Sequence, residues 1–359
     1  MKNSSEISLS HKARPLNQYP LYWAECFGTA PFLPVSRDEM DQLGWDSCDI
    51  IFVTGDAYID HPSFGMTIIG GLLEAQGFRV GIIDQPDWHS VDPFRALGKP
   101  NLFFGVSAGN MNSIINRYMT DRKIRSDDAY SPDDVGGKRP DRCSVVYSQR
   151  CREAYSDVPI VVGGIEAPLR QIAHYDCWQD KVRRSILADT KADLLLYGNA
   201  ERAIVEIAHR LAKGDDMSAI TDIRGSTFFI KDISEDWQIL DSTNVEKPGR
   251  LEKRISPYEI IDQDTCHSGQ GAADKAQPKK QVEITFTGKL KQLQCKLKQR
   301  LKTVIRLPSF DDVNPDPVLY AHANRVLHLD TNPGNARALV QNQGGQKIGF
   351  NPPPAPLTT

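Results

Sequence analysis

The chain has 359 residues, 25% of them charged, and its formal net charge of −3 gives no indication of a nucleic-acid partner. No apolar run approaches the roughly 18 residues of a membrane-spanning helix, and the N-terminal segment lacks the apolar core of a secretory signal. Seven scattered cysteines fit reduced thiols better than a disulfide framework, so we expect a cytoplasmic protein without membrane contacts.

The N-terminal part of the chain is expected to precede the main domain. Residues 1–18 are polar and are predicted to form an arm, and the aromatic, proline-rich residues 19–45 form an irregular lead. Within this lead, Ser36 is followed three residues later by Glu39, which is the spacing of a helix capping box. We therefore expect a short helix that begins after Ser36.

Five apolar runs dominate the next part of the chain. They are DIIFVT from Asp49, FRVGII from Phe78, NLFFGV from Asn101, PIVVGG from Pro159 and ADLLLYG from Ala192. Near-continuous apolar runs of this length are typical of parallel strands that are covered on both faces. A helix is expected between the first two runs, at about Ser63–Gln76. The pattern predicts an α/β chain with a Rossmann-like open parallel sheet, similar to a cobalamin-binding module, with its core at about residues 46–215.

The connection between the third and fourth runs is much longer than usual. Helices are predicted at its two ends, at Asn110–Tyr118 and Cys143–Tyr155, and a charged stretch at 120–141 separates them. This stretch suits a functional loop or a disordered one, and both interpretations stay open. Further helical patterns surround the HYDCW and KVRRSIL segments, and another helix is expected to end at Gly214.

Beyond residue 225 the pattern changes to short strands and polar turns. We therefore assign residues 19–225 to one α/β domain, 226–261 to a short-strand extension and 262–302 to a polar and basic linker. The basic stretch of that linker is interpreted as a solvated helix rather than an RNA contact. Structure is expected to resume at residue 303, and the abrupt proline-rich end suggests that 303–359 is the truncated start of a further region.

Polar and glycine-bearing turns follow the apolar runs. The carboxyl ends of parallel strands meet along one edge of a sheet, and ligands bind at that edge in open α/β folds. We therefore expect a ligand pocket built from these turns, and we assign no catalytic residue and no metal site. The candidate residues are Asp56, Tyr58, Asp60, His61, Ser107, Gly109, Asn110, Gly163, Gly164, Glu166, Asn199 and Glu201.

Each candidate also suits a structural role. The turn that contains His61 suits a ligand or metal contact, but Asp60 or Ser63 equally suits the cap of the following helix. The small residues around Ser107 let a ligand approach the backbone, or let a strand and a helix pack tightly. Glu166 suits a ribose contact, a cation contact or a helix cap.

Several ligand fingerprints are absent from the sequence. There is no G-x-G-x-x-G dinucleotide pattern and no G-x-x-x-x-G-K-[ST] phosphate loop. The D-x-H-x-x-G pattern of histidine-ligated cobalamin also fails, because Asp60 adjoins His61 and Gly65 lies four residues beyond it. Binding of a corrinoid without that histidine stays open.

Two other groups of reactive side chains receive structural interpretations. Cys177 and Trp178, in the HYDCW segment, are expected to be buried structural residues rather than parts of a nucleophilic site. His322 and His328 are six residues apart, which suits no compact helical metal pair.

Five segments of the sequence are DSCDIIFVTGDAYIDHPSFG, EAQGFRVGIIDQPDW, GKPNLFFGVSAGNM, VVGGIEAPLR and LPSFDDVNPDPVLYAHANRVLH. In this order they resemble the amino-terminal region of YgiQ-like (UPF0313) radical SAM proteins. The resemblance runs in order from about Tyr19 to the last residue and is interrupted by the variable linker. The sequence departs from it at Pro168 and Ala200, where the family leads us to expect Ser and Gly.

The resemblance implies an iron–sulfur protein that uses S-adenosylmethionine. In that family a C-x-x-x-C-x-x-C motif holds a 4Fe–4S cluster, because soft thiolates suit such clusters. No three cysteines of this chain have that spacing. We therefore assign no cofactor to this chain, and the resemblance places the cluster motif downstream of the NPP segment.

Three functional hypotheses follow. The first is an accessory domain that shapes or covers the substrate site of a radical SAM core, which would be its partner, with an unknown substrate and no activity alone. The second is a stand-alone module that binds a small nucleotide-like or corrinoid molecule. The third is the inert product of a truncated gene.

Overall fold

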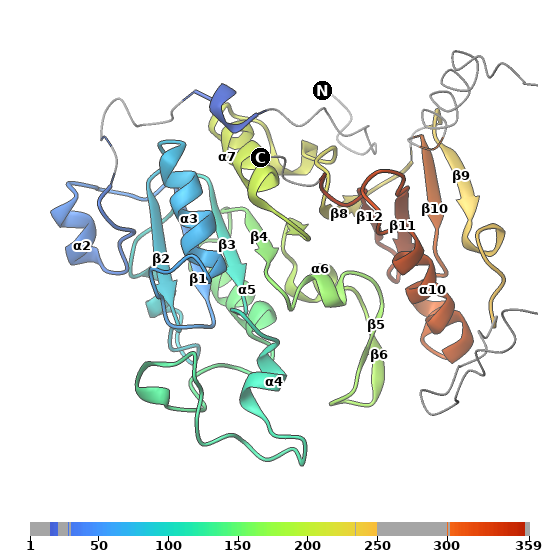
Figure 1. The fold of residues 1–359 in the computed structure, drawn as a ribbon, viewed down its shortest axis with the longest axis horizontal. Coiled ribbons are helices and arrows are strands. Elements are labelled where there is room, and N and C mark those ends of the chain that lie inside the picture. Colours follow the sequence, from blue (N-terminus) through green and yellow to red (C-terminus); the bar gives the residue numbers. More distant parts are fainter. Residues whose placement is uncertain are drawn as a thin grey trace, which may run out of the picture.

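One mixed sheet organises the chain in the computed structural model, which describes residues 15–20, 28, 30–233, 235–249, 300 and 302–355. Ten strands of this described part pair in the order β2-β1-β3-β4-β7-β8-β12-β11-β10-β9 (Figure 1). Their bounds are β1 Ile50–Thr54, β2 Val80–Asp84, β3 Phe103–Ser107, β4 Ile160–Gly163, β7 Leu194–Leu196, β8 Ser226–Ile230, β9 Gln238–Asp241, β10 Thr303–Arg306, β11 Ala338–Asn342 and β12 Lys347–Phe350.

The five apolar runs form the parallel part of this sheet, as predicted. They become β1, β2, β3, β4 and β7, and all neighbouring pairs among them are parallel. Five of the predicted helices are confirmed as well. They are α2 Arg37–Gln42, α3 Gly65–Ala75, α4 Ser113–Arg117, α5 Cys143–Ala154 and α7 Glu201–Ala212. The structure also contains α6 Ile186–Thr190, at the end of the KVRRSIL segment, and adds α9 Phe310–Val313 and α10 Pro317–Leu329.

The start of α2 shows how local sequence fixes a helix end. The Ser36 side chain accepts a hydrogen bond from the Glu39 N–H at 3.3 Å, as the capping spacing predicts. In a standard capping box the Glu39 carboxylate would accept from the N–H of Ser36 itself. Here it accepts from the N–H of the preceding residue, Val35, at 2.7 Å. The cap therefore also fixes the chain that enters the helix.

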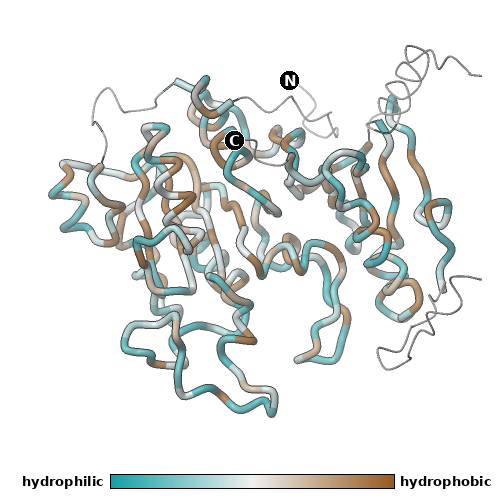
Figure 2. Tube along the Cα trace, in the orientation of Figure 1, coloured by the Kyte–Doolittle hydropathy of each residue, from teal (hydrophilic) through white to brown (hydrophobic). Residues whose placement is uncertain are grey.

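Helices cover both faces of the sheet and divide its core into two layers. On one face α3 and α7 pack together over residues such as Phe52 and Phe103. On the other face α5, α6 and α10 cover a cluster that includes Phe104 and Tyr147. Hydrophobic residues accordingly concentrate along the strands (Figure 2). Burial of both faces explains why these strands read as continuous apolar runs.

The sheet extends well beyond residue 215 and is not purely parallel, which corrects two expectations. Strands β8 and β12 are antiparallel to their neighbours, while β9, β10 and β11 are parallel to one another. The reversal arises because residues 213–225 carry the chain from the end of α7 back to the carboxyl end of β7. There the Tyr197 N–H donates to the Gly225 carbonyl at 2.8 Å, so β8 runs back along β7.

The HYDCW segment and the start of KVRRSIL are not helical, contrary to the prediction, whereas the end of KVRRSIL enters α6 at Ile186. They form a separate two-stranded antiparallel sheet of β5 (His174–Asp176) and β6 (Lys181–Arg183). The Asp176 carboxylate closes the turn by accepting from the Trp178 and Gln179 N–H groups at 2.9 and 3.1 Å. Cys177 is exposed and Trp178 is half-buried, so the expected burial of both is wrong.

Two buried glutamines join this hairpin region to the C-terminal half of the sheet. The Gln341 side chain is fully buried, accepts from the Ala173 N–H at 2.9 Å and donates to the Pro308 carbonyl at 2.8 Å. Gln343 accepts from the Ser185 N–H at 3.0 Å and donates to Gln341 at 2.7 Å. The region from residue 303 therefore packs into the same fold as the parallel strands.

Some predictions fall outside the described residues. Most of the polar arm (1–14), nearly all of the linker at 262–302, and Cys26, Cys266 and Cys295 are among them. Within the described part of the chain, no helix combines the length and apolar character that a membrane crossing requires.

Replacement of Gln341 by Ala should destabilise the fold, because the buried Ala173 N–H and Pro308 carbonyl would lose their partner. A cost of about 1–3 kcal/mol is expected, measured as the free energy of unfolding in urea. Asn342→Ala is the matched control, because Asn342 is the exposed neighbour on the same strand. Equal unfolding curves for the two variants would contradict this role for Gln341.

Candidate functional site

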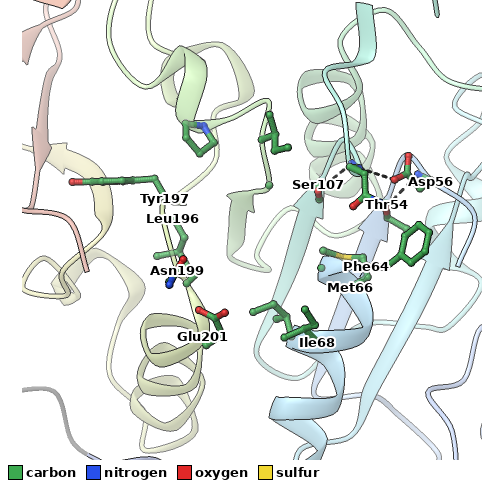
Figure 3. Close-up of a pocket in the computed structure, with 18 of the residues that line it drawn as sticks. Thr54, Asp56, Phe64, Met66, Ile68, Ser107, Leu196, Tyr197, Asn199 and Glu201 are labelled. Carbon is green, nitrogen blue, oxygen red and sulfur yellow. Dashed lines mark hydrogen bonds between the residues drawn. The ribbon is translucent and has the colours of Figure 1, made fainter. Parts of the chain in front are cut away.

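The strand-end turns converge on one cavity of about 560 Å³, beside α3 and α7 (Figure 3). It lies at the carboxyl ends of β1, β3, β4 and β7, as the sequence predicts for an open α/β fold. Eight of the twelve candidate residues line it, namely Asp56, Tyr58, Ser107, Gly109, Asn110, Gly164, Asn199 and Glu201.

The cavity has two walls that come from distant parts of the chain. Figure 3 shows Asp56, Phe64 and Met66, from the β1–α3 region, on one side. Tyr197 and Glu201, from the end of β7 and the start of α7, lie on the other side. A molecule held here would therefore contact the turns after both the first and the fifth strand of the parallel sheet.

A buried guanidinium holds the Asp56 side chain in place. Arg139 is fully buried and donates to Asp56 at 2.7 Å and to Asp128 at 2.7 and 3.1 Å. The other Asp56 oxygen accepts from the Asn110 N–H at 2.6 Å. Burial raises the pKa of the Asp56 carboxyl, although its hydrogen bond to Arg139 opposes the shift. Burial also disfavours the charged guanidinium, but the bonds to Asp128 and Asp56 outweigh it and raise the pKa of Arg139.

This ion group orders the long insertion between β3 and α5. Asp128 and Arg139 both belong to the charged stretch 120–141, and the Ala57 N–H donates to the Tyr130 carbonyl at 2.8 Å. The Gln85 amide, after β2, donates to the Ser131 hydroxyl at 2.6 Å. The stretch is therefore ordered and fixed to the strand-end edge, which contradicts the disordered interpretation; its functional role stays a prediction.

Two glycines in this edge are required by close approaches. Gly109 has φ of +99°, and a Cβ atom there would lie 2.1 Å from an Asp56 oxygen. Gly164 has φ of +77°, and a Cβ atom would lie 2.4 Å from the Ser107 hydroxyl. A side chain at either position would be strained and would displace a group that lines the cavity.

Four candidates lie outside the cavity wall. Gly163 lines a smaller space of about 70 Å³ that adjoins the cavity beneath α3. Asp60 and His61 are exposed, and the His61 ring accepts from the Ser63 N–H at 3.1 Å. Glu166 is fully buried and accepts from the Ser113 hydroxyl and N–H, the latter at 3.0 Å. Glu166 thus anchors the start of α4.

The apolar part of the site was not predicted from the sequence. Ile59, Ile68, Ile165 and Leu169 line the cavity although each is substantially exposed. Large aliphatic residues within polar turns, as in AYIDH and GGIEAPLR, were the available signal. Pro168 and Ala200, the two departures from the family pattern, also line the cavity.

The C-terminal segment reaches the wall of the same cavity. The Tyr197 hydroxyl donates to the Asn351 carbonyl, and the Gly225 N–H donates to the Pro352 carbonyl at 2.8 Å. Pro354 packs so closely on Gly198 that a Cβ atom there would lie 3.0 Å from its ring. The NPPP segment therefore runs directly beside residues that line the cavity.

The described cysteines do not fit an iron–sulfur cluster. Cys48, Cys143 and Cys151 are buried, and burial raises the pKa of all three thiols, that of Cys48 to about 12. Cluster iron is bound by thiolates. Across the described ranges, no three Cys, His, Asp or Glu side chains form a group that could hold a metal ion. No chemical step is therefore assigned to a cluster in this chain.

Comparison with protein families identifies the class of this domain. The family model described as radical SAM N-terminal matches residues 32–359, so the chain belongs to that family. Curated relatives named UPF0313 protein, YgiQ among them, confirm the resemblance to that group.

Curated relatives are close in sequence but longer. A UPF0313 protein of Pseudomonas aeruginosa is 65% identical over 351 residues, which cover 97% of this chain and 46% of that protein. The UPF0313 protein YgiQ of Escherichia coli K12 is 56% identical over 356 residues, which cover 99% of this chain and 47% of that protein. The chain thus spans about half the length of these relatives.

Similarity to solved structures is weak. The radical S-adenosylmethionine methyltransferase TsrM of Kitasatospora setae, solved with cobalamin and a [4Fe-4S] cluster, is 17% identical with a TM-score of 0.33. The match covers 51% of this chain and 27% of that one. Values this low carry no argument about the present chain.

Removal of the buried cation should destabilise the strand-end edge. In Arg139→Met, Asp56 and Asp128 would lose their shared counter-ion, and a loss of about 3–5 kcal/mol in the free energy of unfolding is expected from urea titrations. Lys138→Met removes the adjacent, exposed cation and serves as the control. A loss in Arg139→Met no larger than in this control would show that the ion group is unimportant for the fold.

His174 should make stability fall in mild acid. Burial lowers the pKa of this imidazole from 6.5 to about 4, so the unfolded chain binds a proton first as the pH falls. The stabilisation is present above pH 6.5 and is lost toward pH 4, by about 2 kcal/mol between pH 7 and pH 5. Urea unfolding at both pH values should show a smaller drop in His174→Gln, whereas the exposed-site variant His89→Gln should behave like the parent chain.

Proposed function

We propose that this chain is the N-terminal accessory domain of a YgiQ-like radical SAM iron–sulfur protein, and that its strand-end cavity forms one half of a substrate site. The radical SAM core that would supply the chemistry is its partner, and the chain alone is inactive. The parallel strands, in the order β2-β1-β3-β4-β7, are interpreted as a Rossmann-like unit, since this is the flavodoxin-type order, with its switch point between β1 and β3.

The position of the C-terminal segment carries this proposal. Residues 352–354 pass beside Tyr197 and Gly198 in the cavity wall. The matched region covers 46% and 47% of these longer relatives. A core that continues from this segment would begin next to the cavity, so its site and the cavity would face each other.

The apolar mouth of the cavity supports the same arrangement. Leu169 is 65% exposed and Ile165 is 52% exposed, although both are large aliphatic residues at the cavity rim. Exposed aliphatic side chains grouped around a pocket are typical of surfaces that a partner covers.

The second candidate function, a stand-alone small-molecule module, is supported by the cavity itself, which is large enough for a ligand without a partner.

Protection of the cavity rim distinguishes these two functions. We expect a cysteine at position 169, in Leu169→Cys, to react readily with an alkylating reagent in the isolated chain. Alkylation should become much slower when the chain is joined to the C-terminal half of E. coli YgiQ, because the core would cover the rim. Peptide mass spectrometry at the substituted position measures the rate.

The matched control is Lys213→Cys, at the opposite end of α7, where an exposed side chain should stay reactive in both proteins. Equal reactivity of position 169 in the isolated chain and in the fusion would refute the accessory arrangement. So would a 4Fe–4S spectrum and S-adenosylmethionine cleavage by the isolated chain after reconstitution with iron and sulfide.

A further inference from the structure

The charges that face the cavity are all of one sign. Asp56 and Glu201 are the charged residues in its lining, and among the described residues no lysine, arginine or histidine lines it. The rest of the lining is made of small polar, aromatic and aliphatic residues, with Ile59, Ile68 and Ile165 among the largest. Its electrostatic character therefore depends on how far each carboxylate is neutralised.

Arg139 neutralises Asp56 only in part. The same guanidinium also binds Asp128, so this buried group has two carboxylates and one cation, which leaves one negative charge in excess. The Asp84 carboxylate lies close by and accepts from the Tyr58 N–H at 3.0 Å. The β1 side of the cavity is therefore negative overall.

Glu201 adds an incompletely paired carboxylate on the opposite wall. Its Oε2 atom is buried and has no hydrogen-bond partner in the described part of the chain. A buried polar atom without a partner is costly, and such atoms are normally satisfied by protein, water or a ligand. Glu201 is the first residue of α7 and lines the cavity, so its carboxylate can accept a hydrogen bond from a donor group on a bound molecule.

The N-termini of two helices contribute positive potential to the cavity, but this is weaker than the negative potential of the carboxylates. Both α3 and α7 begin at the cavity without a side-chain cap, and helix N-termini favour anions. A helix end corresponds to roughly half a positive charge, whereas the Glu201 carboxylate carries a full negative charge at the same end of α7. An anionic ligand would therefore meet net repulsion, while the free N–H groups of α3 can serve neutral acceptor atoms.

We propose that this cavity takes a cationic ligand with an apolar body and a hydrogen-bond donor directed at Glu201, and that it excludes phosphorylated and other anionic molecules. The inference rests on the proposed function, in that it treats the cavity as the substrate side of the domain. A cavity of about 560 Å³ suits an aryl amine.

Two small probes with similar aryl bodies and opposite charges test the inference on the isolated chain. They are 2-phenylethylamine and 3-phenylpropionate, and isoleucine methyl NMR follows their binding at Ile59, Ile68 and Ile165. The amine should shift these three methyl signals in a saturable manner and leave that of Ile124, an exposed residue that does not line the cavity, unchanged. The carboxylate and inorganic phosphate should shift none of them.

Substitution of the proposed acceptor sharpens the test. Glu201→Gln should weaken amine binding about tenfold, because a nearby carboxylate contributes about 1.4 kcal/mol or more at a partly exposed site. Glu206→Gln removes the same charge from the same helix, outside the cavity lining, and should leave binding unchanged. An equal loss of amine affinity in both variants would show that Glu201 does not contact the ligand.

Each outcome has a defined meaning. Saturable shifts with the amine alone support the inference, whereas binding of the carboxylate at equal or higher affinity, or no shift with any probe, overturns it. The measurement needs neither the core nor a cluster, so it is separate from the alkylation test. Amine binding without protection of position 169 in the fusion would support the ligand class and refute the accessory arrangement. Protection of position 169 without amine binding would support the accessory arrangement and refute the ligand class.

Discussion

A single buried cation determines the shape of the strand-end edge. Arg139 lies between Asp56 and Asp128, and the carbonyl of Ala108 is also within 3.3 Å of its guanidinium. Charges removed from water are tolerated only when they are well paired. The insertion that carries Arg139 must therefore stay folded against the ends of β1 and β3. The cavity depends on this contact, because Asp56 in turn fixes Asn110.

Much of the parallel half of the fold could be predicted because its signals are local. The runs that became β1 and β3 are buried on both faces, so their residues had to be apolar throughout. Ser36 capped its helix for the same reason, since the partner lies three residues away. The cavity followed from one general rule, that the ends of parallel strands share an edge. That rule predicts that Asp56 and Glu201 line the same cavity, although nothing in the sequence shows a contact between them.

The remaining features depend on contacts between distant residues. Arg139 is a charged residue in a polar stretch, which by itself predicts exposure, and its burial depends on Asp56, far away in the sequence. The reversal at β8 depends on the path of residues 213–225, which have no periodic pattern. The β5–β6 hairpin is a similar case, because its short segments have apolar spacing that fits a helix as well as a strand.

The position of β8 in the sheet has a consequence for synthesis on the ribosome. Thr227 pairs with Phe350, so one edge of β8 acquires its partner only after nearly the whole domain has been translated. Until then the nascent chain carries an unpaired strand edge beside an already complete parallel sheet, and such edges invite pairing with other chains. The sheet is therefore exposed to misassembly until β12 is translated, directly before the segment that borders the cavity.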